Sequence, residues 1–233
     1  VDKSSFRDAQ KYLDKGVSVA AINYRLSVTD PLPVPVMDAA RAIQFLRHKA
    51  SDWNIDKNKF VASGGSAGGC TSTLLACLDD MADSTSKDPV KRESTRLQGA
   101  SVKGAQTAID PKLIEPWIGP NVYHEMIYRA VGEESIEAAL ANYKQHEALY
   151  KQFSAYYHMT SDDPPIYLGY NADMTVPAIS VGRGIHHGMF GVKLKEKSAE
   201  VGHNKIYLDI KGLDETSEYK NGDDFIFSIL LGK

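Results

Sequence analysis

The sequence lacks the features that mark membrane-spanning, nucleic-acid-binding or disulfide-stabilised proteins. Its 233 residues contain no apolar run of about 18 residues, the length that a membrane-spanning helix needs. The formal net charge is -3 at pH 7, so there is no basic excess to attract phosphate, and we expect no nucleic-acid partner. Cys70 and Cys77 are the only cysteines, and in one predicted helix they lie about 10 Å apart, too far for a disulfide. We therefore expect no membrane span, and the sequence does not indicate a cellular compartment.

Helical and strand-like patterns alternate along the chain, which is typical of a mostly parallel sheet flanked by helices. With 42% hydrophobic and 24% charged residues, the composition fits one globular domain over 1–233. Apolar runs predict strands at 17–24, 60–63, 100–109, 165–170 and 205–210, and helical periodicity predicts helices at 4–15, 37–50, 70–78, 189–201 and 223–231. Prolines at 31, 33 and 35 predict a loop over 25–36.

One segment, 111–161, is far longer than an ordinary connection between two strands. Its pattern is helical and it is rich in aromatic residues. We interpret it as a helical insertion that forms a lid.

The sequence Gly-Gly-Ser-Ala-Gly-Gly at 64–69 contains a Gly-x-Ser-x-Gly motif between a predicted strand and a predicted helix. In that context the serine occupies a tight, strained turn that exposes its hydroxyl at the carboxyl end of the sheet. Ser66 is therefore the predicted nucleophile. Gly65 and Ala67 complete the elbow, and the Ala67 N–H is a predicted oxyanion donor.

Several further segments carry a resemblance to a known superfamily: INYRLS at 22–27, MDAARAIQFLR at 37–47, DDPPIYLGYNADMTVP at 162–177 and FGVKLKEK at 190–197. With the elbow, they resemble the α/β-hydrolases, in particular esterases and lipases related to hormone-sensitive lipase and to bacterial acetyl-xylan and feruloyl esterases. The resemblance covers nearly the whole chain. It implies a carboxylesterase-like serine hydrolase that acts on a small ester and needs no cofactor.

The resemblance also implies an acidic triad member in the pattern Asn171-Ala172-Asp173-Met174-Thr175-Val176-Pro177, which makes Asp173 the predicted acid. Members of the group further carry a His-Gly-Gly oxyanion loop and several strands ahead of the helix at 4–15. In this chain these parts would lie before Val1, so we expect an N-terminally truncated, partial domain. A sheet edge left open in this way could pair with another chain and form an oligomer.

The triad histidine is expected after the strand at 205–210, yet no histidine follows His203. A histidine also precedes the FGVKLKEK-like helix in relatives, so His186 is the candidate base, with a structural or capping role as the alternative. His186 and His187 are adjacent, and no cluster of cysteines or carboxylates accompanies them, so we predict no metal site.

Two alternatives to an esterase stay open. The missing triad histidine fits a catalytically degenerate, hydrolase-like binding protein that kept only the elbow. A serine peptidase of the same superfamily also fits the motif.

Overall fold

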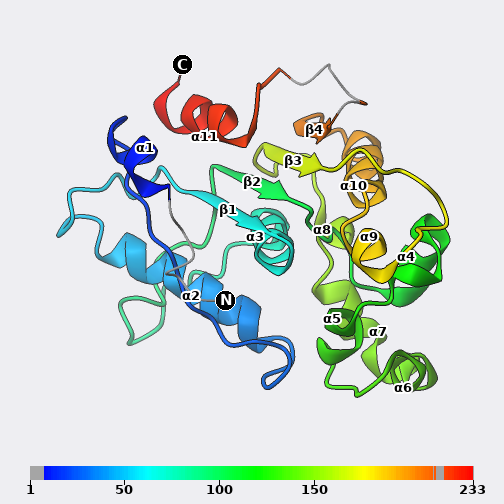
Figure 1. Ribbon diagram of the computed structural model, residues 1–233. Helices are drawn as coiled ribbons and strands as arrows, with labels where there is room; N and C mark the ends of the chain where they lie inside the picture. Colours follow the sequence, from blue (N-terminus) through cyan, green and yellow to red (C-terminus); the bar gives the residue numbers. More distant parts are fainter. Residues whose placement is uncertain (1–7, 212, 214–217, 233) are drawn as a thin grey trace.

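The computed structural model describes residues 8–211, 213 and 218–232, and a parallel sheet lies at its centre (Figure 1). Within the described residues the sheet has four strands, in the order β1-β2-β3-β4. These are β1 (Val61–Gly65), β2 (Gly99–Lys103), β3 (Ile166–Tyr170) and β4 (Ile206–Ile210). All neighbouring pairs are parallel, so the carboxyl ends of the strands share one edge. The predicted fold class is confirmed.

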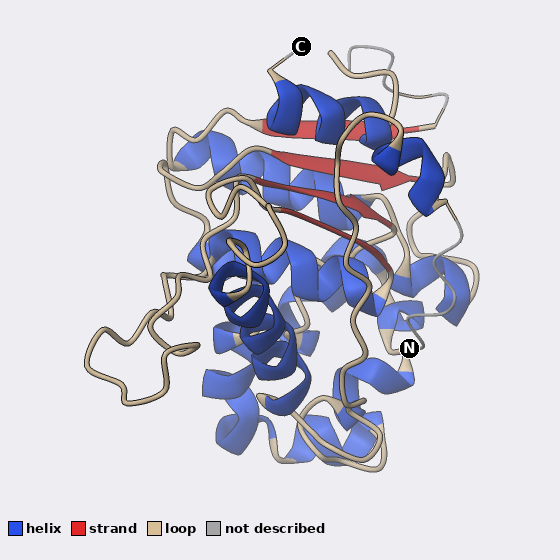
Figure 2. Ribbon diagram, turned by 90° about the vertical axis from the view of Figure 1, so that its left-hand side faces the viewer, coloured by secondary structure: helices blue, strands red, loops and turns tan. Residues whose placement is uncertain are grey.

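Helices cover both faces of the sheet (Figure 2). One face of the sheet packs against α11 (Gly222–Leu231), and α1 (Ala9–Leu13) lies beside that helix. The other face packs against α3 (Ala67–Cys77) and α10 (Met189–Glu200), and α2 (Val34–His48) packs on the outer side of α3. Strand β3 shows the alternation that two covered faces require: Ile166 and Leu168 belong to the core beneath α3 and α10, whereas Tyr167 packs with Phe225 of α11. The two central strands, β2 and β3, are therefore buried on both sides over most of their length.

Between β2 and β3 the chain forms a group of short helices, at the right of Figure 1. They are α4 (Pro111–Ile118), the 3-10 helix η2 (Pro120–Val122), α5 (Glu125–Arg129), α6 (Ile136–Ala141), α7 (Tyr143–Gln152) and α8 (Ala155–His158). A buried carboxylate joins α4, α7 and α8: Asp110 accepts hydrogen bonds from the backbone N–H of Lys112 and from the hydroxyls of Tyr143 and Tyr157. The segment is helical, as predicted, and its role as a lid stays a prediction.

The structure corrects three of the expected elements. Residues 17–24 carry the strand-like sequence but form no strand, since no neighbouring strand in the described chain pairs with them. Strand β2 ends at Lys103 because Gly104 has a φ of 55° and turns the chain out of the sheet. Helix α2 already begins at Val34, because a proline in the first helical turn costs no hydrogen bond.

Two expected features lie partly outside the described residues. These are the start of the helix at 4–15 and the turn after β4, at 211–216, where the resemblance implies the triad histidine. In the described part of the chain, no helix is both long enough and apolar enough to cross a membrane.

Candidate active site

Ser66 occupies the turn between β1 and α3, with φ 50° and ψ -122°. This is a strained backbone for a residue with a side chain. Two glycines allow the turn to close, since a Cβ on Gly64 would lie 2.5 Å from the carbonyl carbon of Gly68. The Ser66 N–H donates to the Lys103 carbonyl at 3.0 Å, which fixes the end of β1 against β2. The sequence motif thus has the strand-turn-helix geometry of a nucleophile elbow.

The first turn of α3 lies directly behind the Ser66 side chain. Ala67 is the first residue of this helix, so its N–H has no acceptor within the helix. The helix N-terminus also carries a partial positive charge. Negative charge that develops beside Ser66 would therefore be stabilised by the Ala67 N–H and by the dipole of α3. Gly65 closes β1, and a Cβ there would lie 3.7 Å from the Lys103 carbonyl oxygen.

An imidazole lies against the Ser66 hydroxyl. His186 Nε2 is 2.9 Å from Ser66 Oγ, and His186 Nδ1 is 2.9 Å from the carbonyl oxygen of Gly182. A carbonyl oxygen only accepts, so Nδ1 carries a proton, and in the neutral ring Nε2 is then the acceptor. This tautomer can receive the proton of the Ser66 hydroxyl.

His186 follows the short helix α9 (Val181–Ile185), which the sequence analysis did not predict. The side chain of Gln106 is buried and its Nε2 donates to the carbonyls of Gly104 and Ile185, at 3.0 and 2.6 Å. A Cβ on Gly104 would lie 3.2 Å from Cδ2 of His186, so this glycine leaves room for the ring. The clamp by Gln106 therefore joins the end of β2 to the residue just before His186.

Helix α9 itself rests on η2. A Cβ on Gly184 would lie 2.1 Å from the Asn121 carbonyl oxygen, and the Asn121 side chain donates to the Ala178 carbonyl at 2.7 Å. The helical insertion thus holds the segment that presents His186.

The two adjacent histidines have different surroundings. His187 is buried; its Nδ1 accepts from the Met189 N–H at 3.1 Å, and its Nε2 lies 3.1 Å from the Thr175 carbonyl. His187 therefore joins the loop after β3 to the start of α10. His203 is buried before β4, where it contacts Ser198 and the Asp163 carbonyl.

Asp173 lies near His186 but bonds to other groups. Its Oδ2 accepts from Arg183 Nη1 at 2.8 Å, and its Oδ1 accepts from the Thr175 N–H at 3.1 Å. Hydrogen bonds from Thr175 and, to a smaller extent, the charge of Arg183 lower the pKa of Asp173 below its ordinary range. His186 instead donates its Nδ1–H to the carbonyl oxygen of Gly182, and this hydrogen bond orients the ring.

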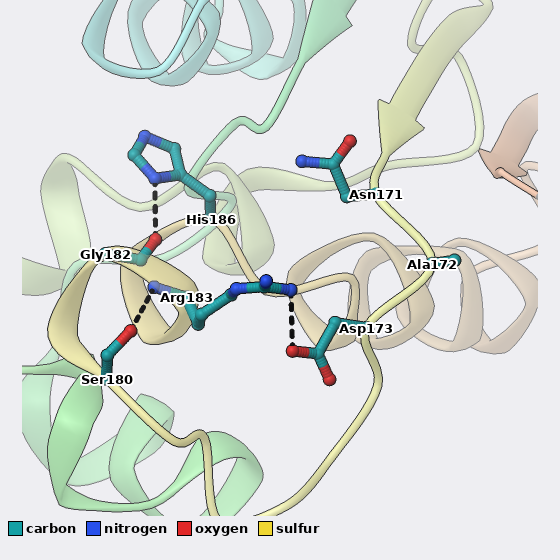
Figure 3. A pocket seen from close by; sticks show the side chains of 7 residues that line it. All are labelled: Asn171, Ala172, Asp173, Ser180, Gly182, Arg183 and His186. Carbon is teal, nitrogen blue, oxygen red and sulfur yellow. Dashed lines mark hydrogen bonds and ion pairs between the residues drawn. The ribbon is translucent and has the colours of Figure 1, made fainter.

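A pocket of about 600 Å³ opens beside His186 (Figure 3). Its lining is mostly polar: Asn171, Ala172, Asp173, Ser180, Gly182, Arg183 and His186. The sequence analysis missed Gly182 and Arg183, because no motif in the sequence distinguishes them. Among the described residues, no group of three or more His, Cys, Asp and Glu side chains could hold a metal ion.

The chain is similar to several known proteins. A stretch of 79 residues is 34% identical to endo-1,4-beta-xylanase B of Butyrivibrio fibrisolvens and covers 32% of this chain but only 12% of that protein. The fold is similar to an acetyl ester-xyloside bifunctional hydrolase from Caldicellulosiruptor lactoaceticus, with a TM-score of 0.60, 21% identity, and coverage of 91% of this chain and 68% of that one.

The fold is also similar to the esterase Est2 of Thermogutta terrifontis with bound butyrate, with a TM-score of 0.58, 20% identity, and coverage of 99% and 74% of the two chains. These likenesses show the α/β-hydrolase fold. The model of the BD-FAE family matches residues 2–180, which include the elbow and Asp173. The chain therefore belongs to the BD-FAE family, an esterase-like family of α/β-hydrolases.

Proposed function

We propose that this protein is a serine carboxylic-ester hydrolase in which Ser66 is the nucleophile and His186 the general base. The observation that supports this most directly is the 2.9 Å contact between His186 Nε2 and Ser66 Oγ at the strained elbow. A serine hydroxyl is a weak nucleophile until a neighbouring base takes its proton, and this contact supplies that base.

The reaction then has two steps. Ser66 Oγ attacks the ester carbonyl while His186 Nε2 takes the hydroxyl proton, and the Ala67 N–H at the N-terminus of α3 binds the oxyanion. His186 returns the proton to the alcohol as the C–O bond breaks. Water then attacks the acyl carbonyl carbon while His186 Nε2 takes a proton from it. His186 returns this proton to Ser66 Oγ as the bond between the acyl carbon and Oγ breaks and the carboxylic acid leaves.

The Gly182 carbonyl keeps His186 in the required tautomer throughout these steps. When the ring becomes an imidazolium, this carbonyl still accepts its Nδ1–H. A neutral carbonyl stabilises the cation less than a carboxylate does. The assignment of Asp173 as the acid of a triad stays a prediction.

By resemblance and by its structural neighbours, the substrate is a small ester, with a short acyl or acetyl group on a carbohydrate or a small alcohol. No cofactor takes part in the proposed steps. The binding-protein alternative rests on a missing base, and the position of His186 argues against it. The peptidase alternative stays open, because hydrolysis of an ester and hydrolysis of a peptide use the same nucleophile and base.

The test is hydrolysis of p-nitrophenyl acetate by the wild type, Ser66→Ala and His186→Ala. Removing either member of a nucleophile-base pair is expected to lower kcat by about a thousandfold or more. The measurement is the steady-state release of p-nitrophenol, with circular dichroism to show that the variants are folded.

Matched controls are Ser51→Ala in the exposed turn after α2 and His48→Ala at the end of α2. Both are expected to keep wild-type rates. Hydrolysis that persists in Ser66→Ala, or a folded wild type without activity, would overturn the proposed function.

A further inference from the structure

We propose that Gln106 is a positioning residue for the reaction, and that its side-chain amide fixes the distance between the base His186 and the nucleophile Ser66. This inference rests on the proposed function, because it takes these two side chains to be the reacting pair. Gln106 acts through the backbone on either side of the site and not on the substrate.

Helix α9, which His186 follows directly, is too short to hold the imidazole by itself. It has five residues, and the first three are exposed. Isolated helices shorter than about 12–15 residues are marginal in water. Only the last two residues of α9, Gly184 and Ile185, are buried. The position of His186 therefore depends on what holds this end of the helix.

The amide of Gln106 binds to this end of α9. Its Nε2 donates to the Ile185 carbonyl at 2.6 Å and to the Gly104 carbonyl at 3.0 Å, so both amide hydrogens are used. Gln106 is only 1% exposed. Water therefore competes little with these two hydrogen bonds, and the low dielectric around them makes them stronger.

The end of β2 gives the two reacting groups a common support. The Lys103 carbonyl accepts from the Ser66 N–H at 3.0 Å. The next carbonyl, that of Gly104, is joined through Gln106 to the residue just before His186. The Gly104 N–H also donates to β3, at 2.8 Å, so this point is part of the sheet. Two adjacent carbonyls thus hold the nucleophile and the base, at 2.9 Å between Oγ and Nε2.

The oxygen of the same amide shows that the donors are what this position needs. Gln106 Oε1 is buried and has no hydrogen-bond partner in the described part of the chain. Buried polar atoms without a partner are rare, because they destabilise the fold. An apolar side chain would avoid the unpaired oxygen, but it would also lose both hydrogen bonds that hold α9 to the sheet. Such features, unfavourable for stability, occur at functional sites.

The first experiment compares Gln106→Met with the wild type in the hydrolysis of p-nitrophenyl acetate. Methionine is flexible and similar in size, but it has no donor, so the end of α9 loses its anchor. We expect kcat to fall about tenfold or more while KM stays within about twofold, because a small displacement of the base slows proton transfer without weakening substrate binding. Circular dichroism shows that the variant is folded at the assay temperature.

Gln44→Met is the matched control. Gln44 is also buried, and its Nε2 donates to backbone carbonyls, the shortest at 2.9 Å to Glu93, but it joins α2 to the loop between α3 and β2. Both variants should lower Tm, and only Gln106→Met should lower kcat. Wild-type kcat in folded Gln106→Met would overturn the inference, whereas hydrolysis that still requires Ser66 would leave the proposed function in place.

Gln106→Glu makes the same contact depend on pH. The carboxyl group that it introduces can donate to a carbonyl only while it is protonated, and once ionised it repels both carbonyl oxygens. Burial moves this ionisation towards neutral pH. Wild-type kcat should rise as His186 loses its proton. The ratio of variant to wild-type kcat should therefore fall about tenfold between about pH 5 and pH 9.

Gln44→Glu should show no such fall in the ratio. A constant ratio in folded Gln106→Glu would contradict a role in holding the base.

A last readout needs no turnover. The ring signal of His186 in the NMR spectrum, assigned by its loss in His186→Ala, should shift in Gln106→Met and stay in place in Gln44→Met. A His186 signal unchanged by Gln106→Met would overturn the inference, whether or not the protein hydrolyses the ester.

Discussion

At the scale of single residues, Asp163 is a carboxylate whose surroundings favour its protonated form. It is buried before β3; Oδ2 accepts from the Thr160 N–H at 2.8 Å, but Oδ1 has no partner in the described part of the chain. Burial raises its pKa above the ordinary 3.8, although Thr160, His203 and Arg96 act in the opposite direction. The folded protein therefore holds this proton at a higher pH than the unfolded chain does.

The sign of the stability effect follows from that difference. As pH rises from about 3.8 through the raised pKa, the folded state gives up a proton that it binds more tightly, and stability falls. Asp163→Asn removes the charge and should raise the free energy of unfolding at pH 7 by about 1 kcal/mol. This gain over the wild type should shrink as the pH falls towards 4, as measured by urea unfolding across that range.

The neighbouring Asp162 is the matched control. Its side chain is 79% exposed, and hydrogen bonding to Thr160 lowers its pKa, so its contribution to stability is present at neutral pH and lost on acidification. Asp162→Asn should therefore be neutral or destabilising at pH 7. A loss of stability in Asp163→Asn similar to that in Asp162→Asn would show that burial does not dominate at Asp163.

At the scale of elements, the elbow depends on the close approach of β1 and α3. A Cβ on Gly64 would meet the Gly68 backbone at 2.5 Å, whereas a Cβ on Gly65 would meet only the Lys103 carbonyl, at 3.7 Å. Gly64→Ala should thus cost about 1–3 kcal/mol, or a few degrees in Tm, while Gly65→Ala should change Tm little. Thermal unfolding measures both, and equal Tm values would contradict this account of the turn.

At the scale of the whole molecule, no strand of the described residues pairs with the outer edge of β1. Within the described residues β1 pairs with β2 alone, and the strand-like segment 17–24 joins no sheet. Exposed edges pair readily with other chains, so we expect association through β1. In light scattering coupled to size-exclusion chromatography, the wild type should exceed the mass of one chain.

A charge on the edge should reverse that association. Ser63 is exposed on β1, so Ser63→Lys is expected to return the protein to a monomer, whereas Ser51→Lys in a distant turn is not. A wild type that stays monomeric at all concentrations would refute edge pairing.

The sequence by itself determined the local features of this protein. The elbow around Ser66 is a short-range turn whose glycines are adjacent in sequence, and the apolar runs of β3 and β4 are buried strands wherever they pair. These features depend on neighbouring residues and on burial, so the pattern predicted the parallel α/β architecture correctly. The strand predicted at 17–24 was wrong because a strand also needs a partner, which no local pattern supplies.

Only the tertiary structure decided which histidine reaches Ser66 and what Asp173 bonds to. The position of His186 depends on the packing of Gly184 against Asn121 and on the Gln106 clamp, contacts between residues far apart in the chain. The partner of Asp173 depends on where α9 places Arg183. Hydrogen bonds go to the groups that folding brings within about 3 Å, and sequence spacing does not fix those distances.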